Sequence, residues 1–227
     1  MIKLKNVIKY YGEGESSFQA LKGVNLNIQK GEFIALMGPS GSGKSTMANI
    51  LGCLDVASGG EYLFENVSVF KLNSKERALL RRFYIGFIFQ GFNLLPRTTA
   101  LENVELPLLY RGVNKIERRK NALEALDMVG LKGWEHHTSN KLSGGQQQRV
   151  AIARAIASKP LFLLADEPTG NLDTKRSVEI MNILKWLNKD LGITILMVTH
   201  ESEMAAYANR EIHFLDGNID SSKGRGN

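Results

Sequence analysis

The sequence has little cysteine and no long apolar run. Cys53 is the single cysteine among 227 residues, which excludes an intrachain disulfide, and no Cys or His cluster indicates a metal site. The uncharged apolar segments, such as Phe33–Met37, Leu161–Ala165 and Ile193–Val198, are far shorter than the roughly 18 to 20 residues of a membrane-spanning helix. The N-terminal segment also lacks the apolar stretch of a secretory signal. We therefore expect a cytosolic chain, unless a partner holds it elsewhere.

The composition is that of an ordinary globular protein. Hydrophobic residues make up 43% and charged residues 23% of the chain, which excludes a disordered or collagen-like protein. The length fits one domain with room for two lobes. Lysine and arginine number 29 against 23 acidic residues, a net charge of +6. This excess suits an anionic ligand, nucleic acid or a lipid surface without distinguishing among them.

The apolar pattern predicts an α/β fold. The three apolar segments named above read as strands buried on both faces of a parallel sheet. A glycine-rich turn and a helix from about Lys44 follow the first strand. Between the second and third, a helix from about Asp173 to Asp190 is indicated by the helical spacing of Ile180, Leu184, Leu187 and Leu191. The order strand, helix, strand predicts a βαβ unit.

Two further regions complete the predicted architecture. Alternating apolar residues at 24–28, 62–64 and 67–69 indicate a smaller antiparallel sheet near the N-terminus. Helical patterns over Ala100–Leu109, Lys115–Val129 and Gln146–Ala157 indicate an inserted helical lobe, in which Ile116, Leu123 and Leu126 should face inward. We expect one domain over 1–220, with a core and antiparallel lobe at 1–90 and 158–220 and a helical subdomain at about 91–157. Residues 221–227 read as a flexible tail.

A phosphate-binding loop is the first chemical motif. Gly38–Ser45 fits the pattern G-x-x-x-x-G-K-[ST] and lies between a predicted strand and a predicted helix, the context that the motif requires. Glycine lets backbone N–H groups approach phosphate oxygens, and the helix N-terminus adds partial positive charge. Lys44 should reach the β- and γ-phosphates and Ser45 should ligate Mg²⁺. The predicted nucleotide-binding residues here are Gly38, Ser40, Gly41, Ser42, Gly43, Lys44, Ser45 and Thr46. A plain Gly/Ser-rich surface turn is the alternative.

Two carboxylates follow the strand Leu161–Ala165. Asp166 and Glu167 stand at the C-terminal end of this strand, the end at which open α/β sheets bind ligands. Asp166 is placed to hold the Mg²⁺ shell through water. Glu167 faces differently, because strand side chains alternate, and is the predicted base for an attacking water. Solvated acids at a strand end are the alternative, which the nearby phosphate loop disfavours.

A second anion-binding helix end precedes these acids. Ser143, Gly144 and Gly145 open a predicted helix at Gln146, so they present a hydroxyl and unhindered N–H groups to an anion. The segment Leu142–Gln146 resembles the signature sequence of the ABC ATPases and lies at the distance before Asp166 that this family uses. The resemblance extends from Lys3 to about Ile219. It implies the P-loop ABC ATPase fold and a head-to-tail dimer, in which the signature of one copy closes on ATP held by the phosphate loop of the other.

The resemblance also implies roles for residues outside these motifs. Gln90 matches the glutamine that contacts Mg²⁺ and the attacking water, and His200 matches the switch histidine at the γ-phosphate. Asp173 matches the loop that couples the two sites of the dimer, and it suits the N-cap of the following helix as well. Tyr11 matches the aromatic that stacks on adenine. Tyr10 is its rival, and an ordinary edge-strand aromatic is the alternative for either.

Further segments resemble the branch of the family that includes macrolide-export, lipoprotein-release and cell-division ATPases. These are Ile50–Asp55, Phe92–Pro96, Leu101–Leu108 and Gly170–Asp173. The branch implies a groove that receives a coupling helix of the membrane partner. The expected lining is Phe92, Leu94, Leu95, Leu101, Val104 and Leu106. For about half of these residues, a place in the core of the helical lobe is the alternative.

The resemblance implies an ATP-binding and ATP-hydrolysing subunit that powers a membrane transporter of the export or mechanotransmission type. Its expected partners are a second copy of itself and an integral-membrane permease subunit, with a periplasmic or extracellular adaptor as an option. Its expected location is the cytoplasmic face of the membrane. Control of cell-wall enzymes through a membrane partner is the alternative. A soluble ABC ATPase that acts on nucleic acid is a further alternative, which the sequence disfavours because Lys44 and Ser143 are only 99 positions apart and enclose no coiled-coil insertion. Nucleic acid is therefore not an expected partner.

Overall fold

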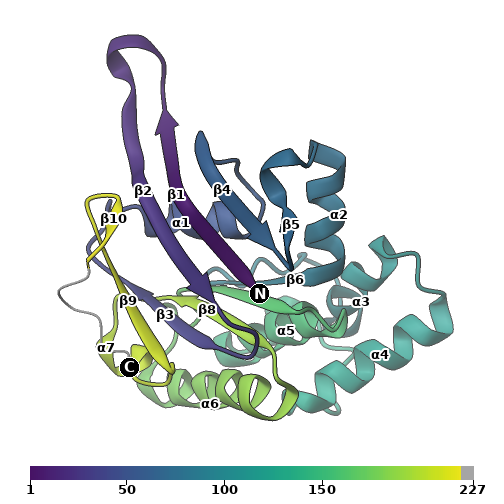
Figure 1. Cartoon of the computed structure of the whole chain (residues 1–227). Helices are drawn as coiled ribbons and strands as arrows, with labels where there is room; N and C mark the ends of the chain where they lie inside the picture. The colour runs from purple at the N-terminus through teal and green to yellow at the C-terminus, as the bar shows by residue number, and fades with distance from the viewer. Residues whose placement is uncertain (221–227) are drawn as a thin grey trace.

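The computed structural model describes residues 1–220 and contains two sheets, shown in Figure 1. One is antiparallel, with the strand order β2-β1-β4-β5; the other has the order β10-β9-β3-β8-β7-β6 and is parallel except for β10. The strands are β1 (Ile2–Tyr11), β2 (Phe18–Ile28), β3 (Phe33–Met37), β4 (Gly59–Phe64), β5 (Val67–Ser68), β6 (Ile85–Phe89), β7 (Phe162–Asp166), β8 (Thr194–Val198), β9 (Arg210–Leu215) and β10 (Asn218–Ile219). The predicted α/β class and the N-terminal antiparallel sheet are confirmed.

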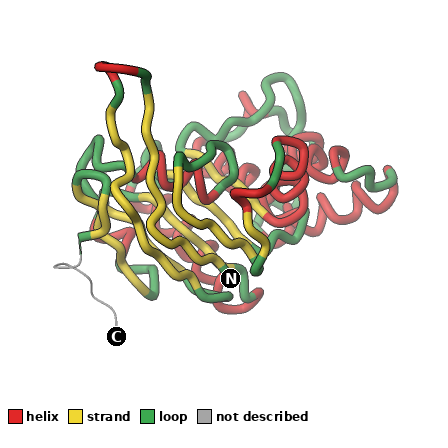
Figure 2. Tube along the Cα trace, turned by 45° about the horizontal axis from the view of Figure 1, so that its top comes forward, coloured by secondary structure: helices red, strands yellow, loops and turns green. Residues whose placement is uncertain are grey.

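Seven α-helices accompany these strands within the described residues. They are α1 (Lys44–Leu51), α2 (Ser74–Tyr84), α3 (Ala100–Tyr110), α4 (Lys115–Met128), α5 (Gly144–Ala157), α6 (Thr174–Leu191) and α7 (Ser202–Ala205). Helices α3, α4 and α5 pack against one another to one side of the sheets, and the β1–β2 hairpin projects beyond the other strands (Figures 1 and 2). No helix among residues 1–220 is long and apolar enough to cross a membrane.

The central strands of the six-stranded sheet are buried on both faces because their residues alternate between two cores. In β3, Phe33, Ala35 and Met37 join a core with α3 to α6. Ile34 and Leu36 join a core with α1 and the antiparallel sheet. Strands β7 and β8 divide in the same way. This arrangement explains the continuous apolar runs in the sequence and confirms that they are doubly covered strands.

The carboxyl ends of four parallel strands lie in one row. Leu36 pairs with Val198, Val198 with Asp166, and Asp166 with Phe89. The loops that leave this row contain Gly38, His200, Glu167 and Gln90. Open α/β sheets bind their ligands at this edge, so the register alone brings the predicted functional residues to one place.

Several predicted details were wrong. Ile116 is 85% exposed and Leu123 is 37% exposed, because α4 packs through a narrow stripe of Ala122, Ala125 and Leu126 in which alanine permits close helix contact. The helix that the spacing of Ile180, Leu184, Leu187 and Leu191 indicates is present as α6; its last residue, Leu191, is 46% exposed before Gly192 turns the chain into the left-handed conformation.

Other differences concern element boundaries and missed elements. Helix α5 begins at Gly144 and not at Gln146, because the hydroxyl of Ser143 caps it. Helix α2 and strands β9 and β10 were not predicted. The predicted flexible tail at 221–227 lies outside the described residues.

Candidate functional site

The phosphate loop joins β3 to α1 and needs glycine at two positions. Gly38 has φ 143° and Gly43 has φ 105°, in the region that favours glycine. A Cβ on Gly38 would lie 2.2 Å from the carbonyl oxygen of Phe214, and one on Gly43 would lie 2.8 Å from that of Ala20. The loop is therefore clamped between β9 and β2, with its backbone fixed before any ligand arrives.

Lys44 and Ser42 differ in their hydrogen bonding within this loop. Lys44 Nζ donates to the carbonyl oxygens of Gly38 and Pro39, both at 2.7 Å. Burial lowers the pKa of Lys44, although the charges of Glu167 and Asp166 oppose this shift. The Ser42 hydroxyl is buried and has no hydrogen-bond partner among the described residues. The ammonium group thus lies across the loop, where an anion would offer it better acceptors.

A cavity of about 740 Å³ opens beside the loop. Its lining includes Asp166, Glu167 and His200 together with the loop residues Gly38, Pro39, Ser40, Gly41, Gly43, Lys44, Ser45 and Thr46. The cavity therefore combines backbone N–H groups and a lysine, which suit phosphate, with a hydroxyl and carboxylates, which suit a hard cation. The predicted loop residues all line it except Ser42, which is buried beneath the loop.

The two carboxylates differ in their surroundings. Burial and the charge of Glu167 raise the pKa of Asp166, and the charge of Lys44 only partly offsets them. Glu167 follows the end of β7 with φ 45°, a left-handed conformation that is uncommon for a residue with a Cβ. Its backbone N–H donates to the Val198 carbonyl at 2.9 Å. The backbone therefore holds Glu167 in a fixed, strained orientation at the mouth of the cavity.

Glu167 contacts the predicted switch histidine. Its Oε1 lies 3.1 Å from Nδ1 of His200, whose side chain is 63% exposed. The pair joins the end of β7 to the end of β8. A carboxylate held by an exposed imidazole is suited to orient a water molecule between them and the phosphate loop.

Gln90 lies in the same row of strand ends but does not line the cavity. Its amide Nε2 is 3.4 Å from Oδ1 of Asn171, and the Asn171 amide donates to the Gln90 carbonyl at 3.0 Å. Gly170 packs against it so closely that a Cβ there would lie 2.6 Å from Nε2. The side chain is thus bound to the loop after Glu167 and not to Ser45 or Asp166.

The signature residues lie outside the cavity. Ser143 Oγ accepts from the Gln146 N–H at 3.4 Å, and Gln146 Oε1 accepts from the Ser143 N–H at 2.9 Å. This capping box starts α5 at an exposed serine. Gly145 is buried, and a Cβ there would lie 3.1 Å from Cδ of Arg176. Within one chain the two predicted anion sites therefore do not meet.

Asp173 has the N-cap role that its spacing predicts. Its Oδ1 accepts from the Arg176 N–H at 2.9 Å, and its Oδ2 lies 3.3 Å from the Arg176 guanidinium. The side chain is exposed. The capping explains its place in the sequence, and the exposure leaves its predicted contact with a second copy open.

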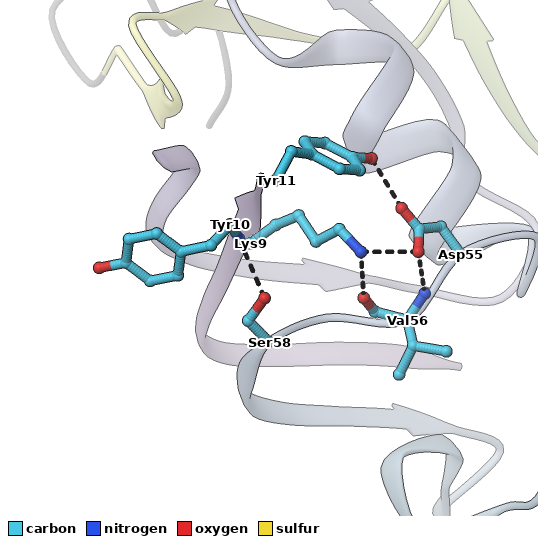
Figure 3. A network of polar contacts seen from close by, with 6 residues as sticks. All are labelled: Lys9, Tyr10, Tyr11, Asp55, Val56 and Ser58. Atoms are coloured by element: carbon cyan, nitrogen blue, oxygen red, sulfur yellow. Dashed lines mark hydrogen bonds and ion pairs between the residues drawn. The ribbon is translucent and has the colours of Figure 1, made fainter. Parts of the chain in front are cut away.

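Tyr11 and its rival Tyr10 differ in their surroundings (Figure 3). The Tyr11 hydroxyl donates to Asp55 Oδ2 at 2.6 Å, and its ring centroid lies 5.6 Å from that of Phe18, a cavity residue. The Tyr10 side chain is 45% exposed and points away from this network. Neither tyrosine lines the cavity, but Tyr11 contacts Phe18, which does.

Sequence reasoning missed one wall of the cavity. Phe18, Gln19, Ala20, Lys22, Asp216 and Gly217 also line it. The Gly217 N–H donates to the Ser42 carbonyl, and its carbonyl accepts from the Lys22 N–H, both at 2.9 Å. The turn between β9 and β10 therefore braces the phosphate loop. Its Asp-Gly dipeptide is a hairpin signal that could have revealed it.

The geometry agrees with comparisons to known proteins. Residues 21–170 match the family model for ABC transporters. The chain is 54% identical over 224 residues to an uncharacterized ABC transporter ATP-binding protein of Methanocaldococcus jannaschii, MJ0796, covering 97% of this chain and 95% of that one. It is 51% identical to the macrolide export ATP-binding/permease protein MacB of Bdellovibrio bacteriovorus, covering 98% of this chain but 34% of MacB.

A solved structure resembles the whole fold. The dimeric post-hydrolysis state of the MJ0796 cassette, bound to ADP and Pi, superposes with a TM-score of 0.88 at 52% sequence identity and covers 97% of both chains. The predicted fold and family resemblance are confirmed. The chain belongs to the ABC transporter family and is an ATP-binding, ATP-hydrolysing cassette of that family.

Proposed function

We propose that this chain is the ATPase subunit of an export-type or mechanotransmission ABC complex, and that it works as a head-to-tail dimer. The proposal is supported by the separation of two groups of predicted phosphate-binding residues, which lie at different places on the chain. Lys44, Glu167 and His200 surround one cavity, whereas Ser143 presents a second anion-binding helix end away from it. Two copies are needed to bring both kinds of group onto one nucleotide.

The residues around the cavity have distinct proposed roles. Tyr11 stacks on the adenine base, and backbone N–H groups of the phosphate loop hold the phosphates. Lys44 exchanges its two loop carbonyls for β- and γ-phosphate oxygens. Glu167 orients the attacking water, and His200 holds Glu167 and reaches the γ-phosphate. Gln90 must release Asn171 to approach the metal and the water.

The residues present fit Mg²⁺. Ser45 and Asp166 line the same cavity and offer hard oxygen ligands. Burial is the larger cause of the raised pKa of Asp166 and the charge of Glu167 the smaller one, and a cation would offset the latter. Mg²⁺ uses few protein ligands in nucleotide sites, because substrate phosphates and waters complete its shell. Bound there, the ion would neutralise charge on the phosphates. We therefore propose Ser45 and Asp166 as its holders, joined by Gln90 after rearrangement.

The pKa of Asp166 predicts how Mg²⁺-dependent ATP binding responds to pH. Because this pKa lies above the ordinary value, protons should compete for Asp166 at a higher pH than at an exposed aspartate. Glu167→Gln removes the neighbouring negative charge and lowers the pKa of Asp166. The loss of Mg²⁺-dependent affinity, titrated from pH 8 down to the ordinary aspartate pKa of about 4, should then occur at lower pH. Glu203→Gln, an exposed change, should leave the midpoint in place; an unmoved midpoint in Glu167→Gln contradicts the prediction.

Trans-complementation tests the dimer. In a Glu167→Gln background, Lys44→Ala removes the phosphate-loop lysine from both sites, and Ser143→Glu places a carboxylate where the second cradle must meet phosphate. Each variant alone should occlude no ATP. Their mixture forms one site with an intact loop from one copy and an intact signature from the other, so it should occlude ATP. Radiolabelled ATP retained after gel filtration measures this.

The control for this experiment is Ser139→Glu, which adds the same charge ahead of the signature. This variant should occlude ATP by itself. Occlusion by Ser143→Glu alone, or none by the mixture, contradicts a shared site.

A second cavity supports a membrane partner. It has a volume of about 460 Å³ and lies between α2, β6, α3 and α5, with Phe87, Leu106, Pro107 and Tyr110 among its lining residues. Of the residues predicted for the groove, Leu106 lines it, whereas Leu101 and Val104 are 3% and 0% exposed and belong to the core. Leu95 is 45% exposed beside the lobe. We propose that this groove receives a coupling helix of an integral-membrane permease, with the lobe at about 91–157 as the membrane-facing subdomain.

A groove variant should separate ATP turnover from docking. Leu106→Asp places a charge in the groove and should abolish co-purification, in detergent, with the integral-membrane protein encoded beside this gene. Turnover by the isolated cassette should persist, because Leu106 lies outside the nucleotide cavity. Ile116→Asp, an 85% exposed change on the same lobe, should leave co-purification intact. Retained co-purification by Leu106→Asp contradicts docking in this groove.

A further inference from the structure

A compact polar network lies behind the Tyr11 ring (Figure 3). Lys9 Nζ donates to Asp55 Oδ1 at 2.7 Å and to the Val56 carbonyl at 2.8 Å. Asp55 also accepts from the Tyr11 hydroxyl at 2.6 Å and from the Val56 N–H at 2.6 Å. The lysine comes from β1 and the aspartate from the loop after α1, so the network ties the strand bearing Tyr11 to the end of the phosphate-loop helix.

The lysine of this network is unusual for a strand lysine. Lys9 is 9% exposed, and burying an ammonium group is costly unless it is fully paired. Its Nζ also lies 4.6 Å from the centroid of the Tyr11 ring, within the range of a cation–π contact. The other lysine of β1 that pairs with an acid, Lys5, has a side chain that is 71% exposed and contacts Glu61 at 3.4 Å. The buried Lys9–Asp55 pair thus lies in direct contact with the Tyr11 side chain.

Both ends of the Tyr11 side chain are fixed by these contacts. Lys9 lies against the ring, and Asp55 holds the hydroxyl. Burial and the hydrogen bond to Asp55 raise the pKa of Tyr11, against a hydrogen bond from Thr46 that lowers it. Burial raises the pKa of Asp55, but the bonds from Lys9 and Tyr11 outweigh it and leave that pKa below its ordinary value. The ring is therefore held by contacts from within the chain.

We propose that Lys9 and Asp55 are positioning residues, which fix the Tyr11 ring in the orientation that accepts the adenine base. The inference rests on the proposed stacking role of Tyr11. A ring fixed in advance loses little rotamer freedom when the base binds, so the network increases the share of the affinity that comes from the base. The side chains of Lys9 and Asp55 bind each other, Tyr11 and Val56 and make no hydrogen bond to the phosphate loop Gly38–Ser45 within the described residues, so we expect their substitution to leave the affinity for the phosphate chain unchanged.

The experiment compares the affinities for ATP and for tripolyphosphate by isothermal titration calorimetry. The dissociation constant for tripolyphosphate divided by the dissociation constant for ATP isolates the contribution of the base and sugar, and this ratio falls when ATP binds more weakly. Stacking of a base on an aromatic side chain contributes about fivefold or more to affinity. Tyr11→Ala should therefore reduce the ratio by about tenfold. Asp55→Asn and Tyr11→Phe should each reduce it by about threefold to fivefold at unchanged tripolyphosphate affinity.

Controls separate positioning from folding. Asp55→Asn leaves Lys9 buried with a weaker partner and can destabilise the chain. The double variant Lys9→Met/Asp55→Asn removes that unpaired charge while still releasing the ring, and it should give the same reduced ratio. Lys5→Met removes the exposed ion pair of the same strand and should leave the ratio unchanged.

Two different failures are distinguishable. An unchanged ratio in Tyr11→Ala overturns the stacking role of Tyr11 and with it the inference. A reduced ratio in Tyr11→Ala together with an unchanged ratio in the double variant overturns the positioning role of Lys9 and Asp55 alone. A parallel loss of ATP and tripolyphosphate affinity in the double variant also overturns it, because the effect would then not be specific to the base.

Discussion

Glu167→Gln should reduce steady-state ATP turnover by at least about 100-fold while ATP binding is retained. Glutamine preserves the shape of the side chain and its contact with Nδ1 of His200 at 3.1 Å, but it cannot take a proton from water. The strained backbone at Glu167 is held by its N–H bond to Val198, which the substitution does not touch. The site should therefore assemble and stop before the chemical step.

The arrested site should appear as a trapped dimer. ATP should move the variant to the dimer position in gel filtration, and ADP should not, because only ATP supplies a γ-phosphate for the second cradle. Glu203→Gln makes the same charge change at an exposed position and should turn over ATP normally. Undiminished turnover by Glu167→Gln would contradict its assignment as the base.

Lys44→Ala should lower ATP affinity on the order of 100-fold, the second large effect. Lys44 is held over the loop by two carbonyl oxygens at 2.7 Å, so its ammonium group is already placed for exchange onto phosphate oxygens. Calorimetry measures the loss directly. In thermal unfolding, ATP should no longer raise the transition temperature, since stabilisation by a ligand requires binding to the folded state.

Lys22→Ala is the matched control for this experiment. Lys22 lines the same cavity from β2 with an exposed side chain. Its substitution removes the same unit of charge without touching the phosphate-loop lysine, and it should lower ATP affinity less than fivefold, as expected for a solvent-screened charge. Equal losses in the two variants, or retained affinity in Lys44→Ala, would contradict the specific role of Lys44.

The sequence was most informative where adjacent residues form the site. A strand, a glycine loop and a helix place Gly38–Ser45, and a buried strand places Asp166 and Glu167. Each motif directly follows a strand, and the carboxyl ends of parallel strands lie at one edge of the sheet, so the sequence order alone brings these motifs together. The N-cap role of Asp173 followed for the same reason.

Contacts between residues that are far apart in the sequence could not be predicted from any sequence pattern. The Lys9–Asp55 pair spans 46 positions, and the brace from Gly217 to the phosphate loop joins β9 and β10 to a segment far upstream. Side-chain partners at such separations produce no periodic pattern. Ile116 was predicted to face inward but is exposed. Helical spacing shows which residues share a face of the helix, but it does not show how much of that face a neighbour covers.

Helix α5 connects two loops of the site. Its 14 residues make a rod about 21 Å long. Ser143 caps one end, Gln148 Nε2 donates to the Pro168 carbonyl at 2.6 Å, and Arg154 NH2 donates to the Phe92 carbonyl at 2.8 Å. The rod thus touches the loop after Glu167 and the loop after Gln90. In the dimer proposed above, a nucleotide contact at Ser143 would therefore act on one end of a helix whose side chains bind both of these loops, so we expect such a contact to be felt at Pro168 and Phe92.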